Sequence, residues 1–213
     1  MQGQGIKLIC LDLDSTLIPD NSWFKLNLAF GITAKEDEEM FKAYISGQLE
    51  YSAWLDKLAA LYKERGLANA DLAKKVLLDY ELKPEIKEVM GYLRDRSYKL
   101  VIISGSFLML TRAVAGELGI DRYEANTELQ FSENGDFIDI KSGGEEKFAK
   151  VRYLEAVCSE LGITLTECAC IGDGRNDAEI FKKTGHGIVF EGHDFEGQVW
   201  KTIKNWSDLK SIF

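Results

Sequence analysis

The sequence predicts an α/β fold in which helices cover both faces of a parallel sheet, with a block of helices inserted after the first strand. Two observations predict it. From Pro84 onward, short apolar runs of strand length alternate with helical patterns, which is typical of parallel strands joined by right-handed crossovers. Between Asp20 and Pro84, the pattern stays helical and contains no convincing strand. We therefore expect a core domain of residues 1–18 and 82–213 and a helical domain of residues 19–81.

The composition excludes several classes of protein. A chain of 213 residues with 46% hydrophobic and 29% charged residues is ordinary for a globular protein. The formal charge of −9 and the scattered Lys and Arg argue against a nucleic acid or an anionic membrane as partner. No apolar run approaches the roughly 20 residues that span a bilayer, and the N-terminus lacks the apolar segment of a signal peptide. The four cysteines lie in apolar patterns that suit a reduced interior. We expect a cytoplasmic protein, either a monomer or a homodimer.

The first strand and the residues after it suggest a chemical site. Leu8 to Leu11 form a short apolar run, which ends at Asp12 and Asp14. If the backbone stays extended, its period of two aims both carboxylates at the same side. Two close like charges favour a bound cation or a shared proton. Such a pair can supply an acyl-phosphate nucleophile and a proton donor, although an Asp- and Ser-rich turn would leave the same pattern.

Four helices are expected in the inserted block, because capping residues and apolar spacing recur there. They are expected, in order, from Asn21 or Ser22 to Phe30, from Thr33 to about Ile45, from Tyr51 to Arg65, and from Asn69 or Asp71 to about Leu78.

The rest of the chain reads as alternating elements with one hairpin. The Asn134-Gly135 dipeptide is a strong hairpin signal between two short strands. Helices are expected at 84–96, 107–118, 147–161, 176–183 and 207–213, and strands at 99–103, 123–125, 129–131, 137–140, 167–171 and 187–190.

Three of the expected parallel strands end in polar residues, and a parallel sheet brings such ends to one edge. The first strand ends at Asp12, the second at Ser104-Gly105, and another at Gly172-Asp173, with Asp177 close behind. Each segment alone could be a plain turn. Together they suggest Mg²⁺ held by Asp12, Asp173 and Asp177 with a backbone carbonyl near Asp14. The Ser104 hydroxyl, the Gly105 amide and one lysine would be donors to phosphoryl oxygens.

This combination resembles the haloacid dehalogenase-like phosphatases. The matching features are DLDST from Asp12, Ser104 after a buried strand, a downstream lysine, and GDGRND from Gly172. The helical insertion resembles the four-helix, C1-type cap of the phosphoserine phosphatase branch. The resemblance implies a Rossmann-like core with a cap. The family's lysine matches Lys150 best, with Lys147 in reserve.

The resemblance also implies residue roles in a two-step phosphate ester hydrolysis with Mg²⁺. Asp12 would attack phosphorus and form an aspartyl-phosphate, and Asp14 would protonate the leaving alkoxide and then activate water. The remaining implied residues are Ser104, Gly105, Lys150 and Asn176 for phosphate, Asp12, Asp14 and Asp173 for the metal, and Asp177 as a support for Lys150.

The substrate is expected to be a small phosphorylated metabolite, but the insertion departs from the phosphoserine phosphatase pattern. Asn21, beside Asp20, stands where that branch has a Glu for the amino group, and Leu58 stands where it has an Arg for the carboxylate. Loss of a bidentate Arg is not neutral, which argues against phosphoserine. Arg175 is a further candidate for substrate contact.

Three alternatives to hydrolysis stay open. A phosphotransferase or mutase of the same fold would pass the phosphoryl group to an alcohol. A receiver-like signalling protein would only carry it on an aspartate, and a binding protein would have no activity. Asp14 favours phosphate ester chemistry, because it gives acid–base help to an oxygen leaving group.

Overall fold

The computed structural model describes residues 5–173, 175–192, 197 and 199–213. Within these residues the strands form one sheet of seven strands in the order β4-β3-β2-β1-β5-β6-β7, parallel except for the β3–β4 pair. The bounds are Leu8–Leu11 for β1, Lys99–Phe107 for β2, Tyr123–Phe131 for β3, Phe137–Ser142 for β4, Cys168–Gly172 for β5, Gly187–Phe190 for β6 and Lys201–Ile203 for β7.

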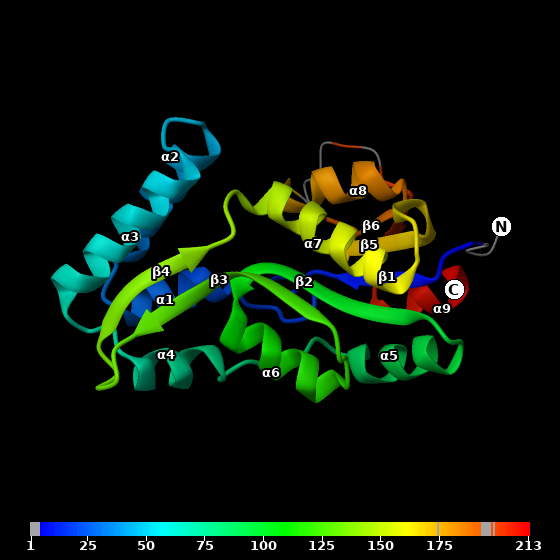
Figure 1. Cartoon of the computed structure of the whole chain (residues 1–213), viewed down its shortest axis with the longest axis horizontal. Helices are drawn as coiled ribbons and strands as arrows, with labels where there is room; N and C mark the ends of the chain where they lie inside the picture. Colours follow the sequence, from blue (N-terminus) through cyan, green and yellow to red (C-terminus); the bar gives the residue numbers. More distant parts are fainter. Residues whose placement is uncertain (1–4, 174, 193–196, 198) are drawn as a thin grey trace.

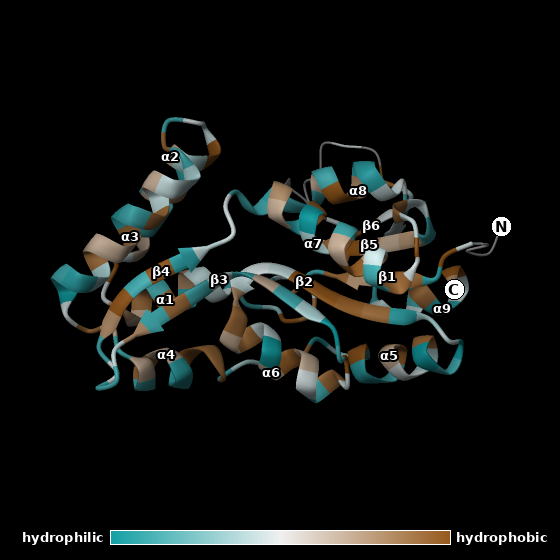
Figure 2. Ribbon diagram, viewed as in Figure 1, coloured by the Kyte–Doolittle hydropathy of each residue, from teal (hydrophilic) through white to brown (hydrophobic). Residues whose placement is uncertain are grey.

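Helices cover both faces of this sheet, as predicted. In Figure 1, α5 (Ile86–Asp95) and α6 (Leu108–Leu118) lie below the sheet, while α7 (Glu146–Leu161) and α8 (Ala178–Thr184) lie above it. The alternation of β1 explains this: Ile9 and Leu11 pack in the cluster that includes α5 and α6, and Leu8 and Cys10 pack in the cluster of α7 and α8. Figure 2 shows the hydrophobic residues along β2 between these layers. The chain ends in the short helix α9 (Leu209–Ile212).

The four helices expected after β1 are present. They are α1 (Ser22–Ala29), α2 (Ala34–Ile45), α3 (Tyr51–Arg65) and α4 (Ala70–Leu77). Their predicted caps explain their bounds: Thr33 forms a capping box with Glu36, and Gly66 ends α3 in the left-handed conformation at φ 68°. In Figure 1 these helices gather beside the β3–β4 hairpin, where the Tyr62 and Phe137 rings lie 5.3 Å apart. The division of the chain into two domains remains our prediction.

Several element bounds were wrong. β2 continues through Ser104 and Gly105 to Phe107, because Phe107 still pairs with Thr127 after an irregularity in the register. The two short strands expected between 123 and 131 are one strand, β3. Its first half pairs with β2 and its second half with β4, so the pairing continues without a break. Strand β7 was not predicted, since three residues carry too little pattern. All four cysteines are buried and free, as expected. Among the described residues, no helix is long and apolar enough to cross a membrane.

Candidate active site

The sheet brings the predicted strand ends together. β1 lies between β2 and β5, so the residues that follow these three strands share one edge. The Asp12 amide donates to the Ile171 carbonyl at 2.9 Å, which continues the ladder one residue past β1. This bond fixes the backbone at Asp12 beside the end of β5, and Asp173 follows directly.

An acidic cluster forms at this edge. Carboxylate oxygens of Asp12, Asp173 and Asp177 all lie within 4.8 Å of one another. Asp12 and Asp177 are buried. A Cβ at Gly172 would lie 2.1 Å from Asp177 Oδ2, so glycine is required here for the close approach of that carboxylate. Carboxylate oxygens of this kind are hard ligands that suit Mg²⁺.

Lys150 is the cation inside this cluster. Its Nζ donates to Asp12 Oδ1 at 2.8 Å and to Asp177 Oδ1 at 2.7 Å, and its side chain is only 1% exposed. Burial opposes the charge of Lys150, but Asp12, Asp177 and Glu146 outweigh burial and hold its pKa well above the usual value. Lys147, the reserve candidate, is 42% exposed and pairs with Glu145 at 2.7 Å.

The cluster carries more acid than Lys150 balances. Burial, with the charge of Asp12 as a smaller cause, raises the pKa of Asp173 to about 6. Burial also raises the pKa of Asp177 to about 8, against the opposing charge of Lys150. Deprotonation of these groups is therefore costly in the metal-free protein, and a divalent cation would offset that cost. The donor set fits Mg²⁺ in both chemistry and charge.

Asp14 has a different environment from Asp12. Its Oδ2 accepts from the Ser22 hydroxyl at 2.6 Å, and the Ser22 and Ser106 hydroxyls lie 2.5 Å apart. Its Oδ1 is buried and has no hydrogen-bond partner among the described residues. Burial raises the pKa of Asp14 to about 7, although the Ser22 hydrogen bond opposes this shift. A carboxyl group with this pKa can hold a proton near neutral pH and release it.

The groups predicted to bind phosphate surround the carboxylate of Glu146, a residue that the sequence analysis missed. Asn176 Nδ2 donates to Glu146 Oε1 at 2.6 Å, and Lys150 Nζ lies 3.7 Å from the same oxygen. A Cβ at Gly105 would lie 1.8 Å from it. Two of the four predicted groups, Asn176 and Lys150, thus contact one anion, and Gly105 lies close beside it. The i,i+4 spacing of Glu146 and Lys150 on a helix was the signal available in the sequence.

The fourth predicted group, Ser104, is buried, and its Oγ accepts from the Ser106 amide at 3.0 Å. Lys83 was also missed by the sequence analysis. Its ammonium donates to the Ser15 carbonyl, which belongs to the turn after Asp14. Burial lowers the pKa of Lys83, and the nearby charges of Asp173 and Asp12 oppose that shift. Nothing in the local sequence around Pro84 indicated this contact, because it depends on tertiary packing.

A comparison with known protein families finds one that matches most of the chain. Residues 6–185 match the family of haloacid dehalogenase-like hydrolases. The chain belongs to this family.

Similar proteins include two phosphoserine phosphatases. The one from Methanocaldococcus jannaschii is 30% identical over 86% of this chain and 85% of its own length. The one from Streptomyces coelicolor is 29% identical over 97% of this chain, which spans only 49% of that relative. A solved structure described as a phospho-aspartyl intermediate analogue of phosphoserine phosphatase has a TM-score of 0.78 and 25% identity, with 98% of this chain and 99% of that chain covered.

In this haloacid dehalogenase-like hydrolase, the acidic edge opens into a cavity of about 770 Å³. The predicted site residues that line it are Asp12, Asp14, Asn21, Ser104, Gly105, Asp173 and Asn176. Its opposite side is formed by α1, α2 and α3. The cavity therefore joins the carboxyl edge of the sheet to the helical insertion.

The predicted specificity residues lie in different places. Asn21 lines the cavity, but its side chain caps α1 by accepting from the Phe24 amide at 3.0 Å. Asp20 is not a lining residue, and its carboxylate pairs with Lys25 at 3.3 Å. The Leu58 side chain is fully buried in the core. Gly174 and the side chain of Arg175 lie outside the described residues.

Proposed function

We propose that this chain is a Mg²⁺-dependent phosphomonoester hydrolase that acts on a small phosphorylated metabolite through an aspartyl-phosphate. The observation that carries the proposal is that Asp12 and Asp14 line one end of a substrate-sized cavity, and that the buried Lys150 donates to Asp12 there. The phosphatase names of the relatives and the phospho-aspartyl analogue among the similar structures support it. We place the enzyme in the cytoplasm, as a monomer or a homodimer.

In this proposal Asp12 is the nucleophile. Lys150 Nζ donates to one of its oxygens at 2.8 Å and so holds the carboxylate in place for attack. Asp12, Asp173 and the main-chain carbonyl of Asp14 hold Mg²⁺, and Asp177 orients Lys150. When bound, the ion supplies positive charge that offsets the phosphoryl oxygens.

Asp14 is the proton donor and acceptor. With a pKa of about 7, its carboxyl group carries a proton that it can give to the leaving alkoxide. The resulting carboxylate can then take a proton from the water that cleaves the aspartyl-phosphate. The Ser22 hydroxyl fixes the carboxyl orientation throughout.

Ser104, Gly105, Lys150 and Asn176 bind the phosphoryl oxygens. The Glu146 carboxylate, which Asn176 and Lys150 contact in the structure, stands in for an anion at this position. Bound phosphate would take over these donors.

We further propose that residues 19–81 act as a cap over the core of residues 1–18 and 82–213. Residues of α1, α2 and α3 line the cavity opposite the strand ends, which supports this division. A cap in this position excludes water and selects the leaving group.

The test is a panel of phosphate esters with purified protein in Mg²⁺ or in EDTA. We expect phosphate release that EDTA removes and that Asp12→Asn abolishes. Asp20→Asn is the matched control, since its carboxylate pairs with Lys25 away from the cavity. Undiminished turnover by Asp12→Asn would contradict the nucleophile assignment. Phosphate that appears in a second alcohol faster than in solution would favour a phosphotransferase.

A further inference from the structure

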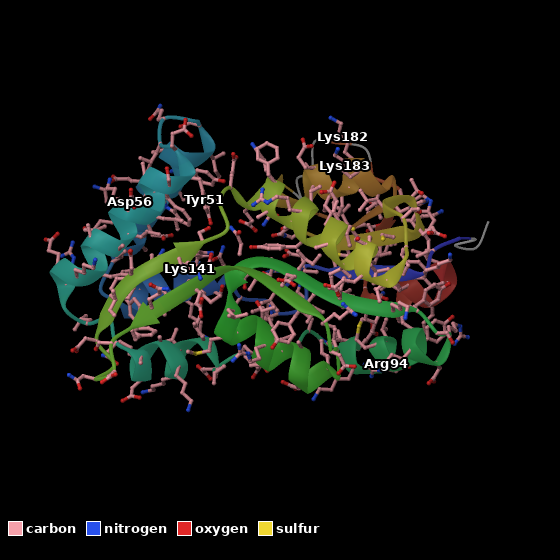
Figure 3. The ribbon with its side chains drawn as sticks, viewed as in Figure 1. Tyr51, Asp56, Arg94, Lys141, Lys182 and Lys183 are labelled. Carbon is pink, nitrogen blue, oxygen red and sulfur yellow. The ribbon has the colours of Figure 1, made fainter. Side chains whose placement is uncertain are left out.

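The cavity has a continuous wall of aromatic rings, formed by Trp23, Phe41, Tyr44, Tyr51 and Trp54, which we call the aromatic wall. Tyr44 stacks on Trp54 with centroids 5.6 Å apart and an angle of 16°, and Trp54 lies 4.9 Å from Trp23. Phe41 continues the wall outward, 6.4 Å from Tyr44. In Figure 3, Tyr51 lies on the side of α3 that faces α7, whereas Asp56 lies on the other side.

The inner end of the aromatic wall reaches the phosphate-binding groups. Trp23 Nε1 donates to the Gly105 carbonyl at 3.4 Å, and the Trp23 ring lies 4.5 Å from Phe107 at the end of β2. An alcohol group leaving from phosphorus at this position would therefore extend along the rings.

The outer end of the cavity exposes apolar side chains to water. Phe24, Phe41 and Ile45 are 41%, 47% and 45% exposed, and all three line the cavity. Single exposed apolar residues are common and need no explanation. Here, however, the three exposed apolar residues line the same cavity as the aromatic wall. Together they form a contiguous apolar surface, which is typical of a ligand site.

The charges around the cavity disfavour an anionic leaving group. Lys147 is the one cation among the described residues that line the cavity, and Glu145 pairs with it. The remaining outer charges are acidic: Asp37 accepts from Asn27 at 2.6 Å, and Glu50 is exposed. Among the described lining residues, a second carboxylate on the substrate would meet repulsion from these acids and no cation that lacks a carboxylate partner.

A cationic leaving group is also less suited than an apolar one. Recognition of an ammonium ion by aromatic rings uses their open faces on several sides of the ion. Here Tyr44 and Trp54 stack on each other, and the rings form one wall. Asp37 and Glu145 already have polar partners, and Glu50 is exposed to water, which screens its charge.

We propose that the site takes phosphate monoesters of apolar alcohols, whose alkyl chain or aryl group lies along the aromatic wall. This inference rests on the proposed function and names the substrate class for it. Burial of the chain would remove apolar surface from water on both the ligand and the wall.

The test compares kcat/KM for methyl, butyl, hexyl and octyl phosphate, together with O-phosphoserine and phosphocholine, all in Mg²⁺. The acidity of the leaving alcohol is nearly constant along the alkyl series, so differences report binding of the chain. We expect kcat/KM to rise by up to about fourfold per methylene, which corresponds to about 0.8 kcal/mol of burial. O-Phosphoserine and phosphocholine should both fall below hexyl phosphate.

Two isoleucines of nearly equal exposure give a matched pair of variants. Ile45 lines the cavity and is 45% exposed, whereas Ile138 lies on β4 away from the cavity and is 46% exposed. Ile45→Ser should lower kcat/KM for octyl phosphate about tenfold and flatten the dependence on chain length. Ile138→Ser should leave both unchanged.

The outcomes separate this inference from the proposed function. Hydrolysis of methyl phosphate with no gain from chain length, or a preference for O-phosphoserine or phosphocholine, would overturn the apolar substrate class and leave the phosphatase proposal intact. Equal effects of Ile45→Ser and Ile138→Ser would also overturn it. No Mg²⁺-dependent release from any ester would overturn the proposed function itself.

Discussion

The two ends of the cavity are built in different ways. One end, with Asp12, Asp14, Lys150, Asp173 and Asn176, is where we propose that phosphate binds, and we call it the phosphate end. Ion pairs and hydrogen bonds hold its groups at the ends of neighbouring strands. The aromatic wall is held by ring contacts on the helices of the insertion. The sheet fixes the relative positions of the charged groups, whereas the rings of Tyr44 and Trp54 on α2 and α3 are placed by contact with each other. In the function that we propose, this arrangement separates the reaction from the choice of substrate.

The largest effect is expected from a substitution in the phosphate end of the cavity. Lys150→Met would leave the buried Asp12 and Asp177 carboxylates without their shared cation. We expect the free energy of unfolding to fall by about 3–5 kcal/mol, as for other broken buried pairs, and activity to be lost. Urea unfolding measures the first and phosphate release the second.

Lys147→Met is the control for this change, since Lys147 lies three residues away on the same helix and is 42% exposed. Its effect on stability should stay within about 0.5 kcal/mol. Equal stability of the two variants would contradict the central position of Lys150.

The second prediction concerns Mg²⁺ and pH at the same end. The pKa values of Asp173 and Asp177 are raised to about 6 and about 8 in the metal-free protein, chiefly by burial. The folded state therefore keeps protons that the unfolded state releases near pH 4. The stability that these groups contribute is complete below about pH 4 and is lost as the pH rises through 6 to 8.

Mg²⁺ binds the deprotonated carboxylates, so it should restore stability most at the higher pH. At a concentration about 100 times its Kd at pH 8, the ion should raise the free energy of unfolding at pH 8 by about 2.7 kcal/mol, and the same concentration should raise it less at pH 6. Unfolding measured at pH 6, 7 and 8 in EDTA and in Mg²⁺ checks this, with Asp173→Asn as a variant that should respond less. A Mg²⁺ effect that does not grow with pH would count against the cluster as the metal site.

Local sequence signals and the alignment of strand ends explain which features the sequence could predict. The apolar strands and the capping residue Thr33 are local signals, and such signals predicted most elements correctly. The phosphate end was predictable because Asp12 and Asp173 follow strands, and Ser104 lies near the carboxyl end of another, in a parallel sheet that must align them.

Other features depend on contacts that no local pattern records. The extension of β2 to Phe107 depends on pairing with β3, and β7 on pairing with β6. The place of Glu146 among the phosphate-binding groups follows from the packing of α7 against Gly105. The ring-to-ring contacts of Trp23 and Trp54 join two separate helices, whereas helical spacing alone reports only that a side chain is buried.

The third prediction concerns Glu146, which lies among the groups of the phosphate end. The Glu146 carboxylate lies beside Asn176 and Lys150, where it competes with a phosphate dianion for the same donors. Glu146→Gln should tighten the binding of inorganic phosphate about tenfold, which is about 1.4 kcal/mol. The repulsion that the substitution removes is large enough for this, since two unit charges about 4 Å apart repel by about 4 kcal/mol at a dielectric constant of about 20. Calorimetric titration with phosphate in Mg²⁺ measures it.

Glu145→Gln is the matched control, because the neighbouring Glu145 pairs with Lys147 instead. We expect its phosphate affinity to stay within about twofold of the unmodified protein. Weaker phosphate binding by Glu146→Gln would mean that Glu146 supports the site and does not compete with the ligand.

The smallest expected effect lies on the helical side. Asn21 lines the cavity but caps α1 through its bond with the Phe24 amide. Asn21→Ala should lower the free energy of unfolding by about 1 kcal/mol, the usual value of such a cap, while the ranking of alkyl phosphates stays the same. Asn21→Asp should keep the stability, since Asp caps helices equally well. A changed substrate ranking at unchanged stability would instead make Asn21 a specificity residue, and it would move part of the choice of substrate from the aromatic wall to the turn after Asp14.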